Sequence, residues 1–115
     1  LPPREPSGPE GTQVFFPFDS STLDDNSRDL LLAHARYLQS HPDRKLQVHG
    51  HADRSGKPIY NLQLSRLRAD SVCSFLTANG ALPRQLASYA WGSADPLRQS
   101  ADPAQNRRVE LIYLP

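Results

Sequence analysis

The stretch KLQVHGHADRSGKPIYNLQLSRLRADSV, residues 45–72, contains the clearest structural signal in the chain. It begins with apolar and polar residues in alternation over KLQVHGH, which is typical of a half-buried β-strand. The polar segment ADRSGK then predicts a turn, and Pro58 suits the first turn of a helix. Apolar residues recur at helical spacing from there to Asn79-Gly80, a typical helix end. We therefore predict a strand over 45–51 and a long helix over 59–78.

Further elements are predicted on both sides of this strand and helix. They are strands over residues 14–18, 86–91 and 107–114, a helix over 28–40, and a long polar loop over 92–106. The apolar residues of each helix fall on one face, with Leu31, Ala35 and Leu38 in the first and Ser65, Ala69, Val72 and Leu76 on the stripe of the second. The order β-α-β-α-β-β predicts the fold class α/β (α+β), a two-layer sandwich with helices packed on one mixed sheet.

Length and composition limit what the chain can be. Its 115 residues suit one domain, with a flexible Pro-rich linker or arm over 1–12 and a folded domain over 13–115. A (β/α)₈ barrel is excluded, because it needs roughly 200 residues or more. The net charge of +1 does not indicate nucleic acid or an anionic membrane surface as a partner. The chain contains no Met, so we expect a processed or truncated piece whose membrane anchor lies outside it.

Two histidines and an aspartate recur at i, i+2 and i+4 in HGHADRSG. His49, His51 and Asp53 would share one face of a straight strand and could then ligate zinc, as in a metal-dependent hydrolase. However, Gly50 and the turn chemistry after Asp53 indicate that the strand does not run straight through these residues. We therefore favour ordinary hydrogen-bonded strand histidines, and we predict no metal, no cofactor and no catalytic residue.

A carboxylate and a guanidinium provide a second candidate site. Asp53 lies between the predicted strand and the long helix, and Asn61, Ser65 and Arg68 share one helix face at i, i+4 and i+7. Such a pocket would suit a zwitterionic ligand, with Asp53 binding an ammonium group and Arg68 a carboxylate. The alternative is an Asp53–Arg68 ion pair that only fixes the turn against the helix. Spacing alone favours this alternative.

Four motifs in a fixed order carry a resemblance to a known family. They are Phe16-Pro17-Phe18-Asp19, Gly50-His51-Ala52-Asp53, Tyr60-Asn61 with Leu64-Ser65 and Arg68-Ala69, and Asn106-Arg107-Arg108-Val109-Glu110. Over about residues 14–113 the chain resembles the OmpA C-terminal-like domain family. It departs from the family pattern at Ala52, where Thr is commoner, and at 102–105, where many members carry a Gly-Arg pair. The second departure bears on the placement of Arg107.

The resemblance implies non-covalent binding of peptidoglycan through the meso-diaminopimelate of its stem peptide. By this resemblance Asp53 binds the ligand's ammonium group and Arg68 its carboxylate, while the loop at Phe18-Asp19 contributes mainly backbone N–H groups. The implied binding residues are Phe18, Asp19, Asp53, Ser55, Asn61, Leu64, Arg68 and Arg107. The domain would tether an envelope protein to the cell wall in the periplasm of a Gram-negative cell, attached to the outer membrane.

A different class of function stays open beside this one. The same fold could serve as a protein-interaction or dimerisation domain of an envelope complex with weak wall affinity. Its partner would then be an envelope protein or a second copy of the chain. The retention of both Asp53 and Arg68 favours wall binding.

Overall fold

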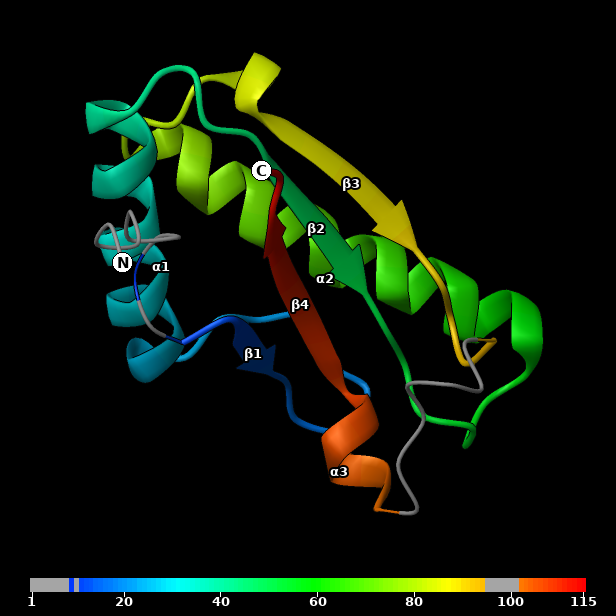
Figure 1. Ribbon diagram of the computed structural model, residues 1–115. Helices are drawn as coiled ribbons and strands as arrows, with labels where there is room; N and C mark the ends of the chain where they lie inside the picture. The colour runs from blue at the N-terminus through cyan, green and yellow to red at the C-terminus, as the bar shows by residue number, and fades with distance from the viewer. Residues whose placement is uncertain (1–8, 10, 95–101) are drawn as a thin grey trace, which may run out of the picture.

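The computed structural model describes residues 9, 11–94 and 102–115, which form two long helices, a short third helix and a four-stranded sheet (Figure 1). The sheet has the strand order β1-β4-β2-β3. β2 and β3 run parallel, whereas β4 is antiparallel to both β1 and β2. The elements are β1 (Gln13–Phe15), α1 (Asp25–Ser40), β2 (Leu46–Gly50), α2 (Pro58–Ala78), a 3₁₀ turn (Pro83–Gln85), β3 (Leu86–Ala90), α3 (Pro103–Asn106) and β4 (Arg108–Tyr113). The predicted fold class, an α/β two-layer sandwich on one mixed sheet, is confirmed.

Two predicted elements differ from the structure in a way that bears on the site. The first strand ends at Phe15 instead of residue 18, because the chain enters a turn in which the Ser20 N–H donates to the Pro17 carbonyl. The predicted loop over 92–106 includes the short helix α3, where the Asp102 side chain caps the Ala104 N–H at 3.0 Å. Residues 95–101 of that loop lie outside the described residues, as do residues 1–8 and 10 of the predicted arm.

The α1 helix begins earlier than its apolar pattern indicated, whereas α2 begins at Pro58, which suited the first turn of a helix. α1 starts at Asp25 because the Asp24 side chain accepts a hydrogen bond from the Ser27 N–H at 2.8 Å, which satisfies one free donor of the first turn. Both predicted apolar faces are buried. The core combines Leu31, Ala35 and Leu38 of α1 and Ala69, Val72 and Leu76 of α2 with Leu46, Val48, Val109 and Leu111 of the sheet.

The α2 helix packs closely on the sheet at Gly50. A Cβ atom added there would overlap the backbone oxygen of Ser65 and would lie 3.2 Å from the Cβ of Ala69. The Ser65 hydroxyl in turn accepts a hydrogen bond from the Gly92 N–H at 2.8 Å, just beyond β3. The absence of a side chain at Gly50 therefore sets how closely α2 packs on the end of β2.

We predict that Gly50→Ala destabilises the domain by about 2 kcal/mol or more, because the added methyl group meets helix backbone that cannot rotate away. Urea unfolding followed by circular dichroism measures the change. Ser88→Ala, on the exposed part of β3, is the control and should change stability little. Equal stability of Gly50→Ala and the wild type would contradict the close packing.

The buried side chain of His34 forms hydrogen bonds to residues near both ends of the chain, Gly11 and Tyr113. His34 of α1 is 0% exposed, and its Nε2 lies 2.7 Å from the carbonyl oxygen of Gly11, which can only accept a hydrogen bond. Nε2 therefore carries the proton, and Nδ1 accepts from the Tyr113 hydroxyl at 2.7 Å. Burial lowers the pKa of His34, which the hydrogen bond to Gly11 only partly offsets. The folded domain thus favours the neutral imidazole.

The free energy of unfolding should therefore fall as the pH is lowered through about 6.5, the ordinary pKa of histidine. Below this pH the unfolded chain binds a proton at His34 that the folded protein disfavours, so acid shifts the equilibrium toward unfolding. Urea unfolding of the wild type and His34→Gln between pH 7 and pH 5 tests this. The variant should show a flatter pH dependence. His41→Gln, at an exposed position, is the matched control, and equal flattening in both variants would contradict the assignment.

Candidate functional site

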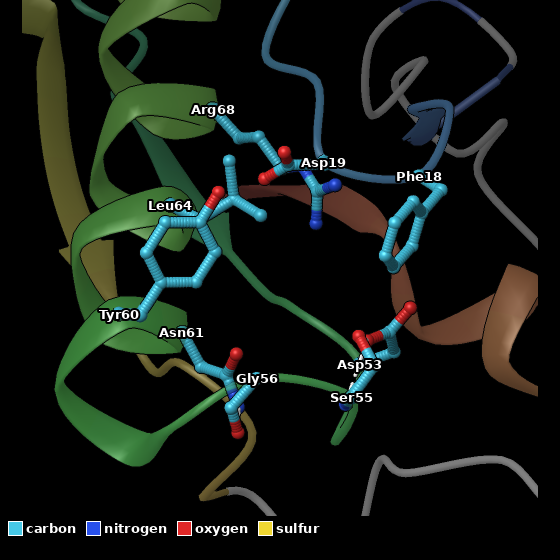
Figure 2. A pocket seen from close by; sticks show the side chains of 9 residues that line it. All are labelled: Phe18, Asp19, Asp53, Ser55, Gly56, Tyr60, Asn61, Leu64 and Arg68. Carbon is cyan, nitrogen blue, oxygen red and sulfur yellow. Dashed lines mark hydrogen bonds between the residues drawn. The ribbon is translucent and has the colours of Figure 1, made fainter.

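A pocket of about 180 Å³ lies beyond the carboxyl end of β2 (Figure 2). Three segments form it: the turn after β1, the segment between β2 and α2, and the first turns of α2. Its lining residues are Phe18, Asp19, Asp53, Ser55, Gly56, Tyr60, Asn61, Leu64 and Arg68. Seven of the eight predicted binding residues therefore meet at one place. The eighth, Arg107, is not part of the lining but contacts Asp53.

Hydrogen bonds hold the Asp53 carboxylate in a defined orientation. Its Oδ1 accepts from the backbone N–H of Ser55 at 2.9 Å and from the Ser55 hydroxyl, and its Oδ2 lies 3.3 Å from Nη1 of Arg107. Burial acts to raise the pKa of Asp53, but the bonds from Ser55 and the charge of Arg107 outweigh it and lower the pKa. The pocket therefore contains a fixed carboxylate that is ionised at neutral pH.

Arg68 extends from α2 to the inner wall of the pocket and is 0% exposed. Its Nε donates to the Ser20 carbonyl at 2.8 Å, Nη1 to that of His51 at 3.0 Å and Nη2 to that of Pro17 at 3.2 Å. Burial lowers the pKa of Arg68 to about 10, a shift that the nearby charge of Asp53 opposes, so the guanidinium stays charged at neutral pH. The pocket thus combines a fixed cation with the carboxylate of Asp53.

The direct Asp53–Arg68 ion pair that spacing favoured is not formed. Within the described residues, the ion-pair partner of Asp53 is Arg107, which lies between α3 and β4. Arg107 also donates from Nε to the carbonyl of Phe16 at 3.2 Å. The departure from the family pattern at 102–105 thus leaves Arg107 beside the pocket, where it links the end of the first strand to Asp53.

Asn61 supports the pocket wall from the first turn of α2. Its amide nitrogen donates to the Gly56 carbonyl at 3.0 Å and to the Ser93 hydroxyl at 3.3 Å, and the residue is 3% exposed. These bonds join α2 to the segment before it and to the residues after β3. They give Asn61 a structural role that its predicted ligand contact did not include.

Two lining residues, Gly56 and Tyr60, were not predicted as part of the site. A Cβ atom at Gly56 would lie 2.6 Å from Oδ1 of Asn61 and 3.0 Å from Cδ2 of Tyr60, so a side chain there would crowd the pocket wall. Tyr60 precedes Leu64 by one helical turn and therefore shares its face, a signal present in the sequence. In Figure 2 the rings of Tyr60 and Phe18 lie on different sides of the pocket.

His49 of HGHADRSG contacts Gln47 on its own strand and aromatic side chains in and just after β3. Nδ1 of His49 accepts from the Trp91 indole N–H at 2.8 Å, and its Nε2 lies 3.0 Å from Oε1 of Gln47. The ring of His49 also stacks on Tyr89, with centroids 4.7 Å apart. Within the part of the chain that the structure describes, no three His, Cys, Asp or Glu side chains are grouped as metal ligands would be. Among the described helices, none has the length and hydropathy that a membrane crossing requires.

The fold and pocket define a small α/β sandwich domain with a charged surface pocket at the end of its central strand. The chain belongs to the OmpA family, whose sequence profile matches residues 15–110. It is 35% identical to a peptidoglycan-associated lipoprotein of Legionella pneumophila over 108 residues, which cover 91% of this chain and 61% of that protein. A peptidoglycan-associated lipoprotein of Pseudomonas aeruginosa is 36% identical, with 87% and 61% covered. The chain thus spans less than two thirds of the length of these relatives.

Two solved structures are similar to this chain. The crystal structure of the peptidoglycan-associated lipoprotein from Burkholderia pseudomallei matches with a TM-score of 0.85 at 36% identity, covering 90% of this chain and 91% of that one. The C-terminal domain of Helicobacter pylori MotB matches with a TM-score of 0.77 at 23% identity, covering 90% and 84%. At this lower identity the second match shows a shared fold alone.

We predict that Arg107→Ala raises the pKa of Asp53, because the variant loses the guanidinium that stabilises the ionised carboxylate. The pH titration of the Asp53 carboxyl carbon by ¹³C NMR measures the change directly. Arg66→Ala, which removes an exposed arginine of α2, is the control. An Asp53 titration that is the same in both variants would show that the contact with Arg107 has no electrostatic effect.

Proposed function

We propose that this chain is a peptidoglycan-binding domain that holds the meso-diaminopimelate of a stem peptide non-covalently. The observation that carries the proposal is the pairing, in one pocket, of an oriented Asp53 carboxylate with the buried Arg68 cation. The side chain of meso-diaminopimelate ends in a carbon that bears both an ammonium and a carboxylate group. A pocket that holds fixed charges of both signs is complementary to such an end.

The roles of the lining residues follow from this complementarity. Asp53 receives the ammonium group, and the carboxylate lies toward Arg68 and the backbone N–H groups of Phe18 and Asp19. Leu64 and the Tyr60 ring face the methylene groups, while Ser55 and Asn61 supply hydrogen bonds and hold the wall. No covalent bond forms or breaks in this binding, so the proposal needs no nucleophile and no general base.

The relatives suggest the cellular context. Several of them are named peptidoglycan-associated lipoproteins. We extend this association to the present chain and place it in the periplasm of a Gram-negative envelope. There it would tether an outer-membrane protein to the wall through an anchor outside the described domain.

A second candidate is a protein-interaction or dimerisation domain with weak wall affinity. It is favoured by large apolar side chains that are exposed on and beside the first half of α2, with Phe18 66%, Ile59 65% and Leu67 54% exposed. Its partner would be an envelope protein or a second copy of the chain. Binding of the stem peptide decides between the two candidates.

Calorimetric titration with a stem peptide that contains meso-diaminopimelate, beside one that contains lysine, tests the main proposal. Lysine lacks the second carboxylate, and the loss of a charge-assisted contact of about 1.5–3 kcal/mol should weaken binding roughly 10-fold to 150-fold. Asp53→Asn should weaken binding of the diaminopimelate peptide by about 2–5 kcal/mol, because the ligand ammonium loses its charged partner.

Arg66→Ala is the matched control for the titrations, since it removes a charge from the exposed face of the same helix. It should leave the affinity for the diaminopimelate peptide close to that of the wild type. Equal affinity for the two peptides would contradict the assigned carboxylate contact. No binding of either peptide by folded protein would favour the protein-interaction candidate.

A further inference from the structure

We propose that Arg68 is a positioning residue: it clamps the turn over Pro17–Ser20, and the backbone N–H groups of this turn receive the ligand's carboxylate. This inference rests on the proposed function and changes how Arg68 acts in it. The resemblance implied a direct contact between the Arg68 guanidinium and the carboxylate. The hydrogen bonds and burial of Arg68 point instead to an effect through the turn.

The turn has a conformation that needs support. The Ser20 N–H donates to the Pro17 carbonyl at 3.2 Å, and Asp19, at the third position, has a φ of 53°. A positive φ at the third position alone is the pattern of a type II turn, in which glycine is strongly preferred. Among the described non-glycine residues, Asp19 alone has a positive φ. An aspartate adopts this left-handed conformation at a cost that surrounding contacts must offset.

Arg68 supplies those contacts at both ends of the turn. Its Nη2 donates to Pro17, the first residue, and its Nε donates to Ser20, the last. Its Nη1 donates to His51, just beyond the end of β2, so the turn is fixed to the sheet as well as to α2. The planar guanidinium reaches three carbonyls at once with a fixed geometry that an ammonium group cannot reproduce.

The guanidinium has little freedom to contact a ligand directly. Three of its five N–H donors are used by these carbonyls, and Arg68 is 0% exposed. By contrast, Phe18 is 66% exposed and Asp19 is exposed as well, and both line the pocket. Within the described residues, neither backbone N–H has a hydrogen-bond acceptor. Consecutive free N–H groups in a turn form a recognised anion-binding arrangement, and here the charge of Arg68 lies behind them.

The first test uses Arg68→Lys, which retains a positive charge but loses the fork of donors. In ligand-free protein the Ser20 N–H should exchange with solvent at least tenfold faster than in the wild type, as followed by ¹H–¹⁵N NMR. The N–H of Leu111, which donates to Thr12 at 2.8 Å, serves as the internal reference for global stability. Asp53→Asn is the matched variant, because it alters the pocket without touching the turn. If the Ser20 N–H of Arg68→Lys exchanged as slowly as in the wild type, the proposal that Arg68 clamps the turn would be wrong.

The second test leaves Arg68 in place and alters the turn, so it stands even if Arg68→Lys fails to fold. Asp19→Val and Asp19→Asn both remove the carboxylate, but asparagine tolerates a positive φ and the β-branched valine does not. Asp19→Val should bind the diaminopimelate peptide at least tenfold more weakly than Asp19→Asn by calorimetry. Equal affinities of the two Asp19 variants would contradict the role of the turn. Binding of the peptide by the wild type would still support the proposed function in that case. No binding by the wild type would overturn both.

Discussion

The contact between β2 and α2 at Gly50 is the constraint on which the core and the pocket both depend. Because Gly50 has no side chain, the backbone of Ser65 lies directly against the end of the strand. Arg68 follows three residues later, less than one helical turn, and so reaches the carbonyl of His51 just beyond the strand. The face of α2 that supplies Ala69, Val72 and Leu76 to the core thus also brings Arg68 to the pocket. The packing of α2 on β2 therefore contributes to the core and to the pocket together.

The burial of Arg68 explains why this site is organised before any ligand binds. A buried cation loses the solvation of water, and among the described residues no carboxylate lies within hydrogen-bonding distance to replace it. Three backbone carbonyls take that place, and the Phe16 ring lies with its centroid 5.4 Å from the guanidinium carbon. These carbonyl dipoles reduce the charge of the guanidinium but do not neutralise it. A ligand carboxylate placed at the Pro17–Ser20 turn would complete the compensation, which links the folding energetics of Arg68 to binding.

Local sequence signals predicted much of the fold and part of the site, for identifiable reasons. The stripe of Ser65, Ala69 and Val72 predicted burial correctly. The alternation over 45–51 predicted a strand, which the structure has over 46–50, but not its burial, because His49 and Gly50 are buried as well as Leu46 and Val48. Arg68 lies on the same stripe, but its charge led to a prediction of a ligand contact and hid the extent of its burial. The Arg107–Asp53 pair joins residues 54 positions apart, and no local periodicity encodes such a contact. The short helix α3 did have a signal, Asp102 followed by Pro103, which the polar composition of the segment obscured.

The charges around the pocket indicate recognition at short range. Asp19 and Asp53 oppose Arg68 and Arg107, so these four groups carry no net charge, and the whole chain has a net charge of only +1. Attraction at a distance is therefore weak, and a zwitterionic ligand end would add no net charge when it binds. Discrimination between ligands must therefore depend on the position of each charge in the pocket. The orientation of Asp53, which Ser55 and Arg107 fix, is then as important as its charge. Groups that are ordered before binding lose little conformational entropy on binding, which would favour a ligand whose charges match these fixed positions.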